Sequence, residues 1–434
     1  MAFKAYDVRG IFGEDVTEEF AQQLGNALMQ HYKCKEIVVG MDMRESSKSL
    51  FQGLSKGITD AGANVHSLGM CPTPLVSYAV ATREFALGIV ISASHNPEEY
   101  NGFKIVKKPG YQVHTSELQD IKAIVERDTY SREEDGKVID EEIMDEYIDH
   151  VSSDARFSGM KLVIDYGNGV GAITAKKVYD KLDCETEHMF SEPDGSFPNH
   201  EANPVVEENL SLLKKRVVER GAIGIAFDGD ADRCIFVDEK GNMVPVDLLT
   251  AFLAKYELSG NKKVYYDLRF SHVVEEEVRR LGGEPVKMKV GNPFYKEALL
   301  EEGGAFAAEF SGHMMFPKNY CIDDGLFASI VVLNALANEG KPLSEVINSY
   351  RVHAATPEIN MRVKDPDRIF KRLSEHYSAG KFLDIDGITI EYPEWWFNLR
   401  KSNTEPVVRL RLEADSEELR DEKLAELKEL IKKE

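Results

Sequence analysis

Three aspartates stand at alternate positions in the segment FDGDADRCIFVDEKG: Asp228, Asp230 and Asp232. Carboxylates this close repel one another and raise each other's pKa unless a cation offsets their charge. Hard oxygen ligands suit Mg²⁺ or Ca²⁺ rather than zinc. An EF-hand loop is excluded, because Arg233 stands at the sixth position, where the sharp turn needs glycine. The cluster therefore predicts a site for a divalent cation, and the alternative is a solvated acidic turn.

Another segment, RKSNTEPVVRLR, places arginines and small polar side chains around a turn. Such residues, together with free backbone N–H groups, form anion nests, in which arginine adds bidentate charge. An ordinary capped hairpin has the same pattern, so both interpretations stay open on this segment alone. The candidate phosphate-binding residues are Arg400, Ser402, Asn403, Thr404 and Arg409.

The segment EFSGH sets Glu309, Ser311 and His313 at alternate positions, so that all three can face one side. This arrangement suits hydrogen bonding to sugar hydroxyls, and a polar hairpin edge is the alternative. Further cations stand near glycine turns or close to the N-terminus, where such residues usually lie on the surface: Lys289, Lys296 and Arg9.

The stretch GIVISASHNPEEYNGFKI carries Ser94 and His95 out of an apolar run. The pair could be a nucleophile with its base, a serine that carries phosphate, or a turn. A serine hydrolase would place its nucleophile in a GxSxG turn and take its base from elsewhere in the chain. We also expect a histidine directly after the serine to reach its neighbour's hydroxyl poorly. Beside the cation and phosphate patterns, the stretch favours a serine that carries phosphate next to Mg²⁺.

Three segments that would position these loops begin alike: KEIVVGMDMRESS at 35–47, MKLVIDYGNGVGA at 160–172 and NKKVYYDLRFSHVV at 261–274. Each predicts a short strand, a turn with aspartate and the start of a helix. A second strand follows each and ends in a polar loop: FALGIVISASHN, GAIGIAFDGDADR and GGAFAAEFSGH. We interpret them as three similar α/β domains that each present one loop where such proteins bind ligands. The alternative is that βα units simply look alike.

After about residue 355, strands joined by turns and two helical stretches, near 366–377 and from Ser416 onward, predict a smaller α+β domain. The segment RVHAATPEIN is a plausible linker into it. The predicted domains are 1–150 with the serine loop, 151–253 with the metal loop, 254–354 with the sugar loop, and 355–434 with the phosphate loop.

The totals of the chain exclude several classes of protein. Its 434 residues exceed one ordinary core, and a composition of 43% hydrophobic and 29% charged residues is typical of a soluble globular protein. A net charge of −22 argues against a nucleic-acid partner, although a local basic cluster can still bind an anionic small molecule. Without a signal peptide or an apolar run of about 20 residues, we expect a cytoplasmic protein with no membrane partner. The scattered cysteines form no CxxC pair.

In this order, the motifs resemble those of the α-D-phosphohexomutases, specifically the phosphomannomutase/phosphoglucomutase branch. The resemblance runs over nearly the whole chain and rests on AYDVRG at 5–10, GMDMRESS at 40–47, SASHNPEEYNGFK at 92–104, DGSFPNHEANP at 194–204, DGDADR at 228–233, EFSGH at 309–313 and RKSNTEP at 400–406. It implies three similar α/β domains and a smaller C-terminal α+β domain around a central cleft. It also implies an isomerase that moves phosphate between O1 and O6 of mannose, and of glucose, through a hexose 1,6-bisphosphate that also acts as activator.

The resemblance assigns roles around the serine. Ser94 would be phosphorylated, and one Mg²⁺ per chain would be bound by a phosphoserine oxygen and the three aspartates. Lys104 would be the general acid/base, which requires neighbouring cations and burial to depress its pKa. Arg9 would approach the reacting phosphate, His95 would stabilise the phosphoserine, and Arg233 would buttress the metal site.

The resemblance also assigns roles toward the substrate. Glu309 and Ser311 would hydrogen-bond the sugar 3- and 4-hydroxyls, with His313 close by and Lys289 among the substrate-binding residues. The residues of the RKSNTEPVVRLR segment would hold the phosphate that is not being transferred. Because the loop grips whichever phosphate is not at the serine, the intermediate must turn around between two transfers.

Three departures from the family pattern lie in the third domain. Ala308 stands where glycine is usual, Arg269 where lysine is common, and GNPFYK lacks the usual histidine after glycine. We expect catalysis to survive them and substrate preference to be the property that changes. The alternatives are a phosphoglucosamine mutase, a sugar-phosphate phosphatase and a sugar-phosphate-binding regulator. We expect a monomer or a homodimer.

Overall fold

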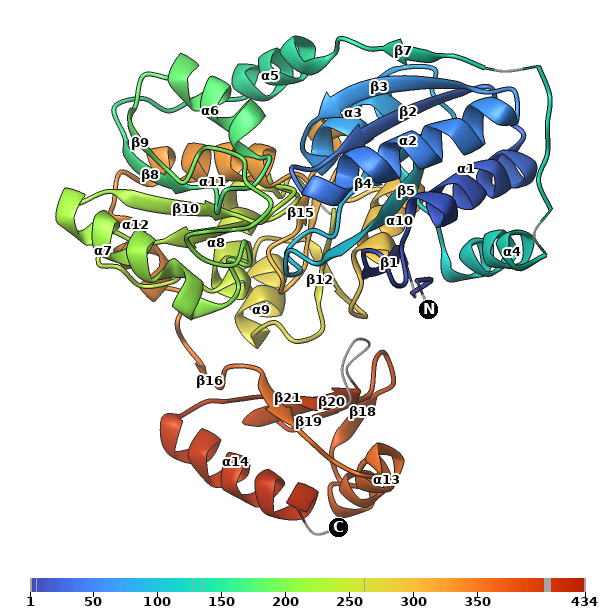
Figure 1. Cartoon of the computed structure of the whole chain (residues 1–434). Helices are drawn as coiled ribbons and strands as arrows, with labels where there is room; N and C mark the ends of the chain where they lie inside the picture. The colour runs from blue at the N-terminus through green and yellow to red at the C-terminus, as the bar shows by residue number, and fades with distance from the viewer. Residues whose placement is uncertain are drawn as a thin grey trace. The chain divides into compact units, whose positions relative to one another are not determined.

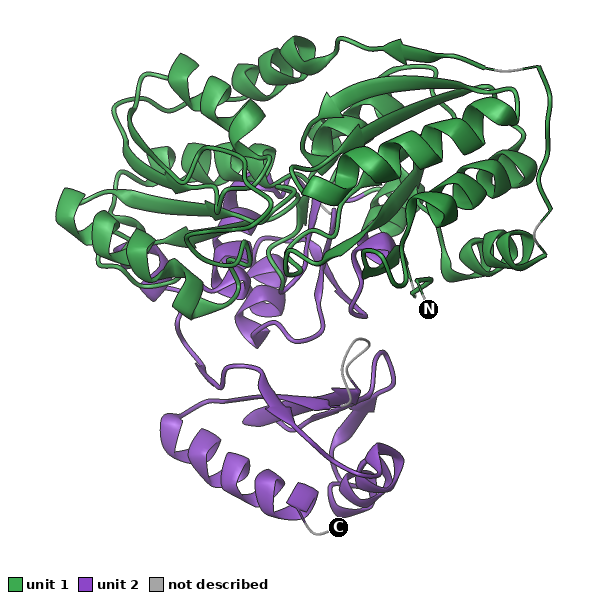
Figure 2. Cartoon of the chain, viewed as in Figure 1, with its two compact units in different colours: residues 1–244, 296–303, 311–344 green, residues 245–295, 304–310, 345–434 purple. Residues whose placement is uncertain are grey.

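The computed structural model describes residues 2–4, 6–127, 129–134, 136–260, 262–401 and 407–432. The chain forms two compact units, one made of residues 1–244, 296–303 and 311–344 and the other of residues 245–295, 304–310 and 345–434 (Figure 2). Within the described ranges, no helix combines the length and the apolar character that crossing a membrane requires.

The N-terminal domain is built on a mixed sheet with the strand order β1-β5-β4-β2-β3-β7, in which β6 also pairs with β5 (Figure 1). Strands β4, β2, β3 and β7 run parallel, whereas β5 is antiparallel to β4 and to β1. The strands are β1 (Val8–Ile11), β2 (Glu36–Met41), β3 (Asn64–Met70), β4 (Leu87–Ile91), β5 (Tyr100–Lys107), β6 (Tyr111–Gln112) and β7 (Val138–Asp140). The helices are α1 (Glu18–Tyr32), α2 (Glu45–Asp60), α3 (Thr73–Thr82), α4 (Thr115–Glu126) and α5 (Met144–Ser153).

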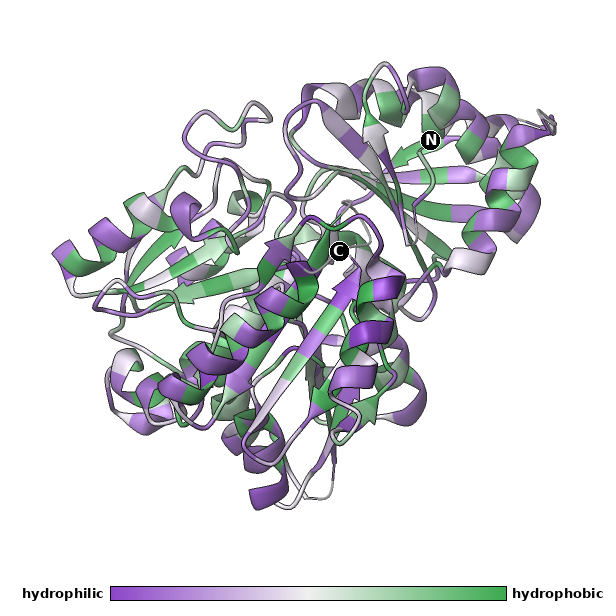
Figure 3. Cartoon of the chain, turned by 90° about the horizontal axis from the view of Figure 1, so that it is seen from below, coloured by the Kyte–Doolittle hydropathy of each residue, from purple (hydrophilic) through white to green (hydrophobic). Residues whose placement is uncertain are grey.

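Local sequence explains how this domain forms. The apolar run of β4 is buried throughout, as expected for a strand with neighbours on both sides and helices on the sheet's faces. Helix α1 begins after Thr17, whose side chain accepts the N–H of Phe20 at 3.1 Å, and glutamates in its first turn favour the positive end of the helix dipole. Hydrophilic and hydrophobic residues alternate along many of the helices (Figure 3), so one side of such a helix can pack on a core, whereas α3 is buried over most of its length.

The second domain has the strand order β11-β10-β8-β9. Strand β8 is parallel to β9 and β10, and β11 is antiparallel to β10. Its elements are β8 (Lys161–Asp165), α6 (Ala172–Lys181), β9 (Glu185–Met189), the 3₁₀ helix η1 (Glu207–Leu210), α7 (Ser211–Arg220), β10 (Ile223–Phe227) and β11 (Cys234–Val237). The same unit contains β15 (Met314–Met315), the 3₁₀ helix η2 (Pro317–Asn319) and the buried helix α11 (Gly325–Glu339).

In the third domain, parallel strands lie side by side in the order β13-β12-β14. Its elements are α8 (Val246–Glu257), β12 (Lys263–Asp267), α9 (His272–Arg280), β13 (Glu284–Met288), α10 (Asn292–Glu302) and β14 (Phe306–Ala308), and α12 (Leu343–Asn348) comes later in the chain.

The repeat predicted from the sequence is confirmed by strand order. A central strand, β2, β8 or β12, has parallel neighbours on both sides: β3 and β4, β9 and β10, or β13 and β14. An aspartate ends or follows each central strand, and its carboxylate accepts the N–H two residues on, from Arg44 at 3.0 Å, Gly167 at 2.8 Å or Arg269 at 3.0 Å. The serine, aspartate and EFSGH loops follow β4, β10 and β14, which are therefore equivalent strands.

The C-terminal domain is an α+β domain, as predicted. Its antiparallel sheet has the order β16-β21-β20-β19-β18, and β17 pairs with β21. Its elements are β16 (Ala354–Ala355), β17 (Ile359–Met361), α13 (Pro366–His376), β18 (Lys381–Leu383), β19 (Ile388–Glu391), β20 (Trp395–Lys401), β21 (Val408–Ala414) and α14 (Glu417–Lys432). Leu373 of α13, Leu427 of α14 and Phe397 of β20 share one apolar core.

The predicted domain boundaries stay predictions. The boundary at 150/151 lies within α5, the boundary at 253/254 within α8, and the boundary at 354/355 within β16.

Candidate active site

Ser94 lies in the loop that follows β4, close to the end of the buried strand. Its φ of +53° is in the left-handed region, which residues other than glycine adopt rarely. Its N–H donates to Ser92 Oγ at 2.9 Å, and its hydroxyl donates to Asp228 Oδ2 at 2.8 Å. Ser94 is only 1% exposed. Backbone held in such a conformation by its neighbours is typical of functional sites. The loop therefore directs the hydroxyl at the aspartate cluster.

Arg44, for which no role was predicted, holds the serine loop. Its terminal nitrogens donate to four backbone carbonyls of that loop, those of Ser94 (3.0 Å), Asn96 (2.6 Å), Pro97 (2.5 Å) and Tyr100 (3.0 Å). Its Nε pairs with Asp42 at 3.1 Å, and both side chains are 1% exposed. The signal was present in the sequence, because an Asp-x-Arg unit follows the central strand in both the first and the third repeat.

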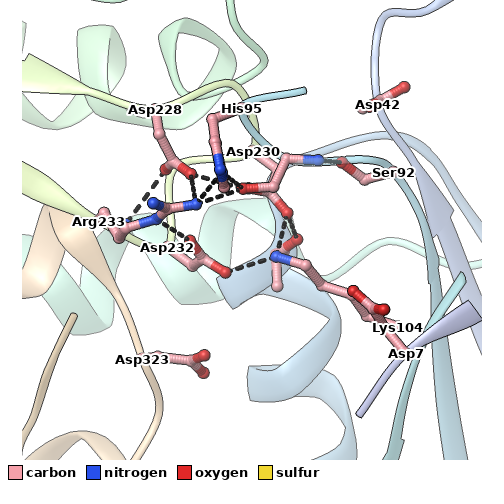
Figure 4. Close-up of polar contacts among 12 residues, drawn as sticks. Asp7, Asp42, Ser92, His95, Lys104, Asp228, Asp230, Asp232, Arg233 and Asp323 are labelled. Carbon is pink, nitrogen blue, oxygen red and sulfur yellow. Dashed lines mark hydrogen bonds and ion pairs between the residues drawn. The ribbon is translucent and has the colours of Figure 1, made fainter. Parts of the chain in front are cut away.

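The three aspartates of the predicted metal site lie together in the structure. Asp228, Asp230 and Asp232 are buried, and one carboxylate oxygen of each lies within 4.8 Å of the other two (Figure 4). They occupy the loop between β10 and β11, in which Ala231 has a φ of +61°. The Oδ1 of Asp230 is buried and makes no hydrogen bond within the described part of the chain. Buried oxygens without donors are suitable ligands for a hard cation, so the cluster fits Mg²⁺.

Thr73 fixes one member of this cluster and was also missed. Its hydroxyl donates to Asp230 Oδ2 at 2.5 Å, and its N–H donates to the Asp230 carbonyl at 3.0 Å. Thr73 is the first residue of α3, so the positive end of that helix faces the aspartate. The sequence alone could not reveal this contact, because it joins positions far apart in the chain.

Replacing Thr73 by valine keeps the shape of the side chain and removes its hydroxyl. We expect Mg²⁺ affinity to fall about 10- to 100-fold, the usual effect of losing a partner that orients a metal ligand. Calorimetric titration with Mg²⁺ measures this change. The matched control is Thr250→Val, since Thr250 is also buried and its hydroxyl donates to the carbonyl of Val246 in its own helix. Equal Mg²⁺ affinities in the two variants would contradict the role of Thr73.

The aspartate loop packs against other backbone with no room for side chains. A Cβ on Gly229 would lie 2.6 Å from the carbonyl oxygen of Ser94. A Cβ on Gly325, at the start of α11, would lie 2.5 Å from the carbonyl oxygen of Arg233. The first contact joins the serine and aspartate loops main chain to main chain, and the second joins the aspartate loop to the start of α11.

Lys104, on β5, bridges two of the aspartates. Its Nζ lies 2.6 Å from Asp230 Oδ2 and 2.6 Å from Asp232 Oδ2 (Figure 4). The expectation of a depressed pKa for Lys104 is wrong for this arrangement of side chains. Burial does oppose the charge, but Asp230 and Asp232 outweigh it and raise the pKa of Lys104 above its usual value. Lys104 is therefore a protonated ammonium here.

The pKa values of Asp228 and Asp232 are shifted in opposite directions. Burial, together with the nearby carboxylates, raises the pKa of Asp228 to about 7, although Arg233 opposes the shift. Burial acts in the same direction on Asp232, but Lys104 and His313 hold its pKa well below the usual range. The cluster thus combines one carboxyl that titrates near neutrality with one that stays ionised.

Arg233 joins the metal cluster to the serine. Its Nη2 lies 2.7 Å from Ser94 Oγ and 3.1 Å from Asp228 Oδ2, and it also contacts His95 Nδ1. Arg233 therefore reaches the serine itself, which extends the expected role of buttressing the metal site.

His95 lies close enough to contact its neighbour's hydroxyl, contrary to expectation. Its Nδ1 is 3.1 Å from Ser94 Oγ. Burial and the charge of Arg233 hold its pKa well below the usual value, so the imidazole is neutral and a weak base. The contact therefore does not make Ser94 and His95 a hydrolase pair.

Arg9, on β1, lies beside the serine loop. Its Nη1 donates to Asn96 Oδ1 at 2.6 Å, and its Nη2 pairs with Asp7 at 2.6 Å. Its charge also contributes to the low pKa of His95. Arg9 is thus a cation near Ser94, as expected for a group that approaches a phosphate there.

The EFSGH segment is a turn rather than a strand edge, since Phe310 and Ser311 lie in a turn after β14. Ser311 Oγ and His313 Nδ1 are 2.9 Å apart, and His313 Nε2 lies 3.3 Å from Asp232 Oδ1. His313 therefore reaches the aspartate cluster of its own unit, and Ser311 is linked to that cluster through His313. Glu309 belongs to the other unit, where it is 6% exposed.

The remaining substrate-binding candidates divide into three groups. Arg400 on β20 and Arg409 on β21 stand opposite each other in the sheet register. Ser402, Asn403 and Thr404 lie outside the described residues. Lys289, in the third domain, is exposed, and its Nζ lies 3.6 Å from the centre of the Phe294 ring.

Comparison with known proteins places the whole chain. Family models of phosphoglucomutase/phosphomannomutase match α/β/α domain I at residues 1–132, domain II at 145–241, domain III at 243–352 and the C-terminal domain at 358–430. A phosphomannomutase of Methanocaldococcus jannaschii is 37% identical over 443 aligned residues, covering 100% of this chain and 98% of the relative. A phosphomannomutase/phosphoglucomutase of Pseudomonas aeruginosa is 33% identical, covering 96% and 92%.

A solved structure agrees with these sequence matches. The phosphoglucomutase/phosphomannomutase family protein of Burkholderia thailandensis has a TM-score of 0.92 and 31% identity, and the match covers 99% of this chain and 97% of that one. Fold and relatives define a hexose phosphate mutase, an isomerase whose substrates are sugar phosphates. The chain belongs to the phosphoglucomutase/phosphomannomutase family.

Proposed function

We propose that the protein interconverts the 1- and 6-phosphates of mannose, and also of glucose, through a phosphoserine at Ser94 and a hexose 1,6-bisphosphate intermediate. The observation that carries this proposal is the surroundings of the Ser94 hydroxyl. It lies 2.8 Å from a carboxylate of the metal cluster and 2.7 Å from the Arg233 guanidinium. A serine between a cation site and a fixed guanidinium suits phosphoryl transfer, which depends mainly on positioning and charge stabilisation.

In the first transfer, a sugar hydroxyl oxygen forms a bond to the phosphorus carried by Ser94, and the bond from phosphorus to Ser94 Oγ breaks. The hydroxyl proton passes to a base, for which Lys104 is the candidate once it is neutral. In the second transfer, the other phosphate of the bisphosphate returns to Ser94 Oγ, and the sugar oxygen that it leaves takes up a proton. Arg233, Arg9 and His95 would hold the phosphoryl oxygens through both transfers.

Asp228, Asp230 and Asp232 would hold Mg²⁺. When bound there, the ion supplies positive charge that stabilises the phosphoryl oxygens and the departing oxygen. The aspartates would then be neutralised by the ion instead of by Lys104. Because Asp230 and Asp232 are what raise the pKa of Lys104, that exchange lowers it toward the range a general base needs.

The remaining candidates would bind the rest of the substrate. Glu309, Ser311 and His313 supply hydrogen-bonding groups for sugar hydroxyls, and Arg400 with Arg409 supplies charge for the distal phosphate. Arg400 is 2% exposed, so its position is set by the fold before any ligand arrives. Preorganised charge of this kind binds phosphate with little cost in side-chain ordering.

Phosphorus NMR tests the proposal. The protein is incubated with Mg²⁺, a trace of hexose 1,6-bisphosphate and, in separate tubes, mannose 1-phosphate, glucose 1-phosphate or glucosamine 1-phosphate. We expect the first two 1-phosphate signals to be replaced by 6-phosphate signals. Faster conversion of the glucosamine compound would instead favour a phosphoglucosamine mutase. Accumulation of inorganic phosphate alone would identify a phosphatase, and no change in any tube would overturn the proposal.

The raised pKa of Asp228 predicts a pH dependence of Mg²⁺ binding. Since the folded pKa of about 7 exceeds that of an unfolded aspartate, ionisation as the pH rises through 7 destabilises the metal-free protein. Mg²⁺ needs the ionised carboxylate, so its affinity should fall about tenfold per pH unit below 7 and level off above it. Titration calorimetry in two buffers of different ionisation enthalpy should detect release of one proton at pH 6. No proton release would contradict the prediction.

A further inference from the structure

One carboxylate faces three arginines in the unit that contains the C-terminal domain. Glu358, just before β17, lies 3.0 Å from Arg269 Nη1 and 3.2 Å from Arg400 Nη2 through the same oxygen, Oε1. Its other oxygen lies 3.7 Å from Arg409 Nη1. The three guanidiniums come from separate segments: the loop after β12, strand β20 and strand β21. Glu358 is therefore the point where the two proposed phosphate-binding arginines meet a third cation.

The arginines do not depend on Glu358 equally. Arg269 also pairs with Asp267, through its Nε at 2.8 Å and its Nη2 at 2.5 Å, so most of its charge is matched there. Arg400 is buried, and its Nε makes no hydrogen bond within the described ranges. Burial and the charge of Arg269 lower the pKa of Arg400 below its usual value. Nearby negative charge therefore does not fully offset the burial of Arg400 and its repulsion from Arg269.

Glu358 stays ionised in this setting. Burial opposes its charge, but Arg269 and Arg400 outweigh that effect and hold its pKa below the usual range. A carboxylate presents two oxygens to guanidinium donors much as one edge of a phosphate does. Glu358 therefore accepts a hydrogen bond from Arg400 and forms an ion pair with Arg409, the two arginines that the proposed function assigns to the substrate phosphate.

We propose that Glu358 is a built-in counter-ion of the distal phosphate site, which the phosphate of the substrate displaces from Arg400 and Arg409. The inference rests on the proposed function, because that function assigns those arginines to the non-transferring phosphate. A displaced carboxylate keeps a partner, since Arg269 lies at 3.0 Å. Repulsion between Glu358 and the phosphate lowers the affinity of the site for that phosphate. A mutase that must turn its bisphosphate around needs such binding to be reversible.

The test compares the binding of inorganic phosphate to the wild-type protein and to Glu358→Gln, which removes the charge and keeps the shape. Unfolding temperatures are measured over a phosphate series at constant ionic strength, with chloride as the balancing ion. We expect the variant to be less stable in chloride and to bind phosphate about five- to tenfold more tightly, because the competing anion is gone. Equal or weaker phosphate binding would overturn the proposal.

Glu391→Gln is the matched control. Glu391 is a partly buried glutamate of the same domain that pairs with Lys287 and Lys381 rather than with arginines. Its variant should lose stability without any change in phosphate affinity. If Glu358→Gln fails to fold in chloride, the proposal requires phosphate to restore the folded protein. The proposal is also overturned if phosphate does not restore the folded Glu358→Gln protein and if chloride and phosphate have the same effect on the stability of the control.

The two proposals fail in different ways. Phosphate binding needs no turnover, so a wild-type protein that is inactive on every sugar phosphate would overturn the proposed function and leave this measurement valid. If the Glu358→Gln enzyme is active and its phosphate affinity and KM are unchanged, the proposed function stands and only the counter-ion role of Glu358 is overturned. Should the phosphate gain persist in Glu358→Gln/Arg400→Lys, the gain does not arise at Arg400, which would also count against the inference.

Discussion

Replacing Ser94 by alanine should reduce hexose phosphate turnover by about four to six orders of magnitude, the scale of loss when a covalent nucleophile is removed. The fold should remain, because Arg233 and Asp228 still pair with each other at 3.1 Å without the hydroxyl. Coupled-enzyme assays of mutase turnover measure the loss. Intact-mass spectrometry after incubation with hexose 1,6-bisphosphate should find phosphate on the wild-type chain and none on the variant.

Ser55→Ala is the control for Ser94→Ala. Ser55 is a buried serine of α2 whose Oγ has no hydrogen-bond partner in the described part of the chain. Its loss should leave turnover and phosphorylation unchanged. If Ser94→Ala kept near-normal activity, Ser94 would be removed from the mechanism. If it kept the phosphate but lost activity, another residue would be the phosphate carrier.

Lys104→Met should have two separate effects. Without its cation, the buried pair Asp230 and Asp232 loses its partner, and the metal-free protein should lose about 3–5 kcal/mol of unfolding free energy. Saturating Mg²⁺ should restore most of that stability, because the ion can neutralise the same carboxylates. Turnover should stay about 10²- to 10⁴-fold below wild type even with Mg²⁺, because the acid/base group is absent.

Denaturant unfolding with a chelator or with Mg²⁺ separates these two effects. Lys287→Met is the matched control, since Lys287 is also 12% exposed and pairs with a carboxylate, that of Glu391. Its loss of stability should be the same with and without Mg²⁺. A Lys104→Met protein that Mg²⁺ does not stabilise would show that the lysine and the ion do not share the aspartates.

Much of this architecture could be predicted because short apolar runs in the sequence mark the buried strands. The repeated strand-then-loop pattern identified β4, β10 and β14 as equivalent strands and so placed Ser94 and Asp228 in corresponding loops. From their spacing alone, the alternating aspartates predicted that their carboxylates would lie together, as they do in the structure. Residue types that do chemistry, at the end of a buried strand, are a signal that a single sequence carries.

Contacts between distant positions could not be predicted in this way. Thr73 has ordinary local surroundings in the sequence, and only folding brings it to Asp230. The repeated Asp-x-Arg unit marks Arg44, but the carbonyls of the serine loop to which it donates depend on the folded chain. The pKa of Lys104 was misjudged for a related reason. The direction of the pKa shift depends on whether carboxylates or cations lie nearest to Lys104. The fold places carboxylate oxygens of Asp230 and Asp232 at 2.6 Å from its Nζ.

The close packing of Gly229 and Gly325 limits how this enzyme can change by mutation. Neither residue donates, accepts or ligates with a side chain, yet a single methyl group at either position would collide with a carbonyl oxygen of the site. Selection for the reaction therefore keeps glycine at these two positions, because any side chain there would collide with the backbone of the site. The serine and aspartate loops are too closely packed for a side chain at Gly229. Substitutions that change substrate preference must therefore occur elsewhere in the chain.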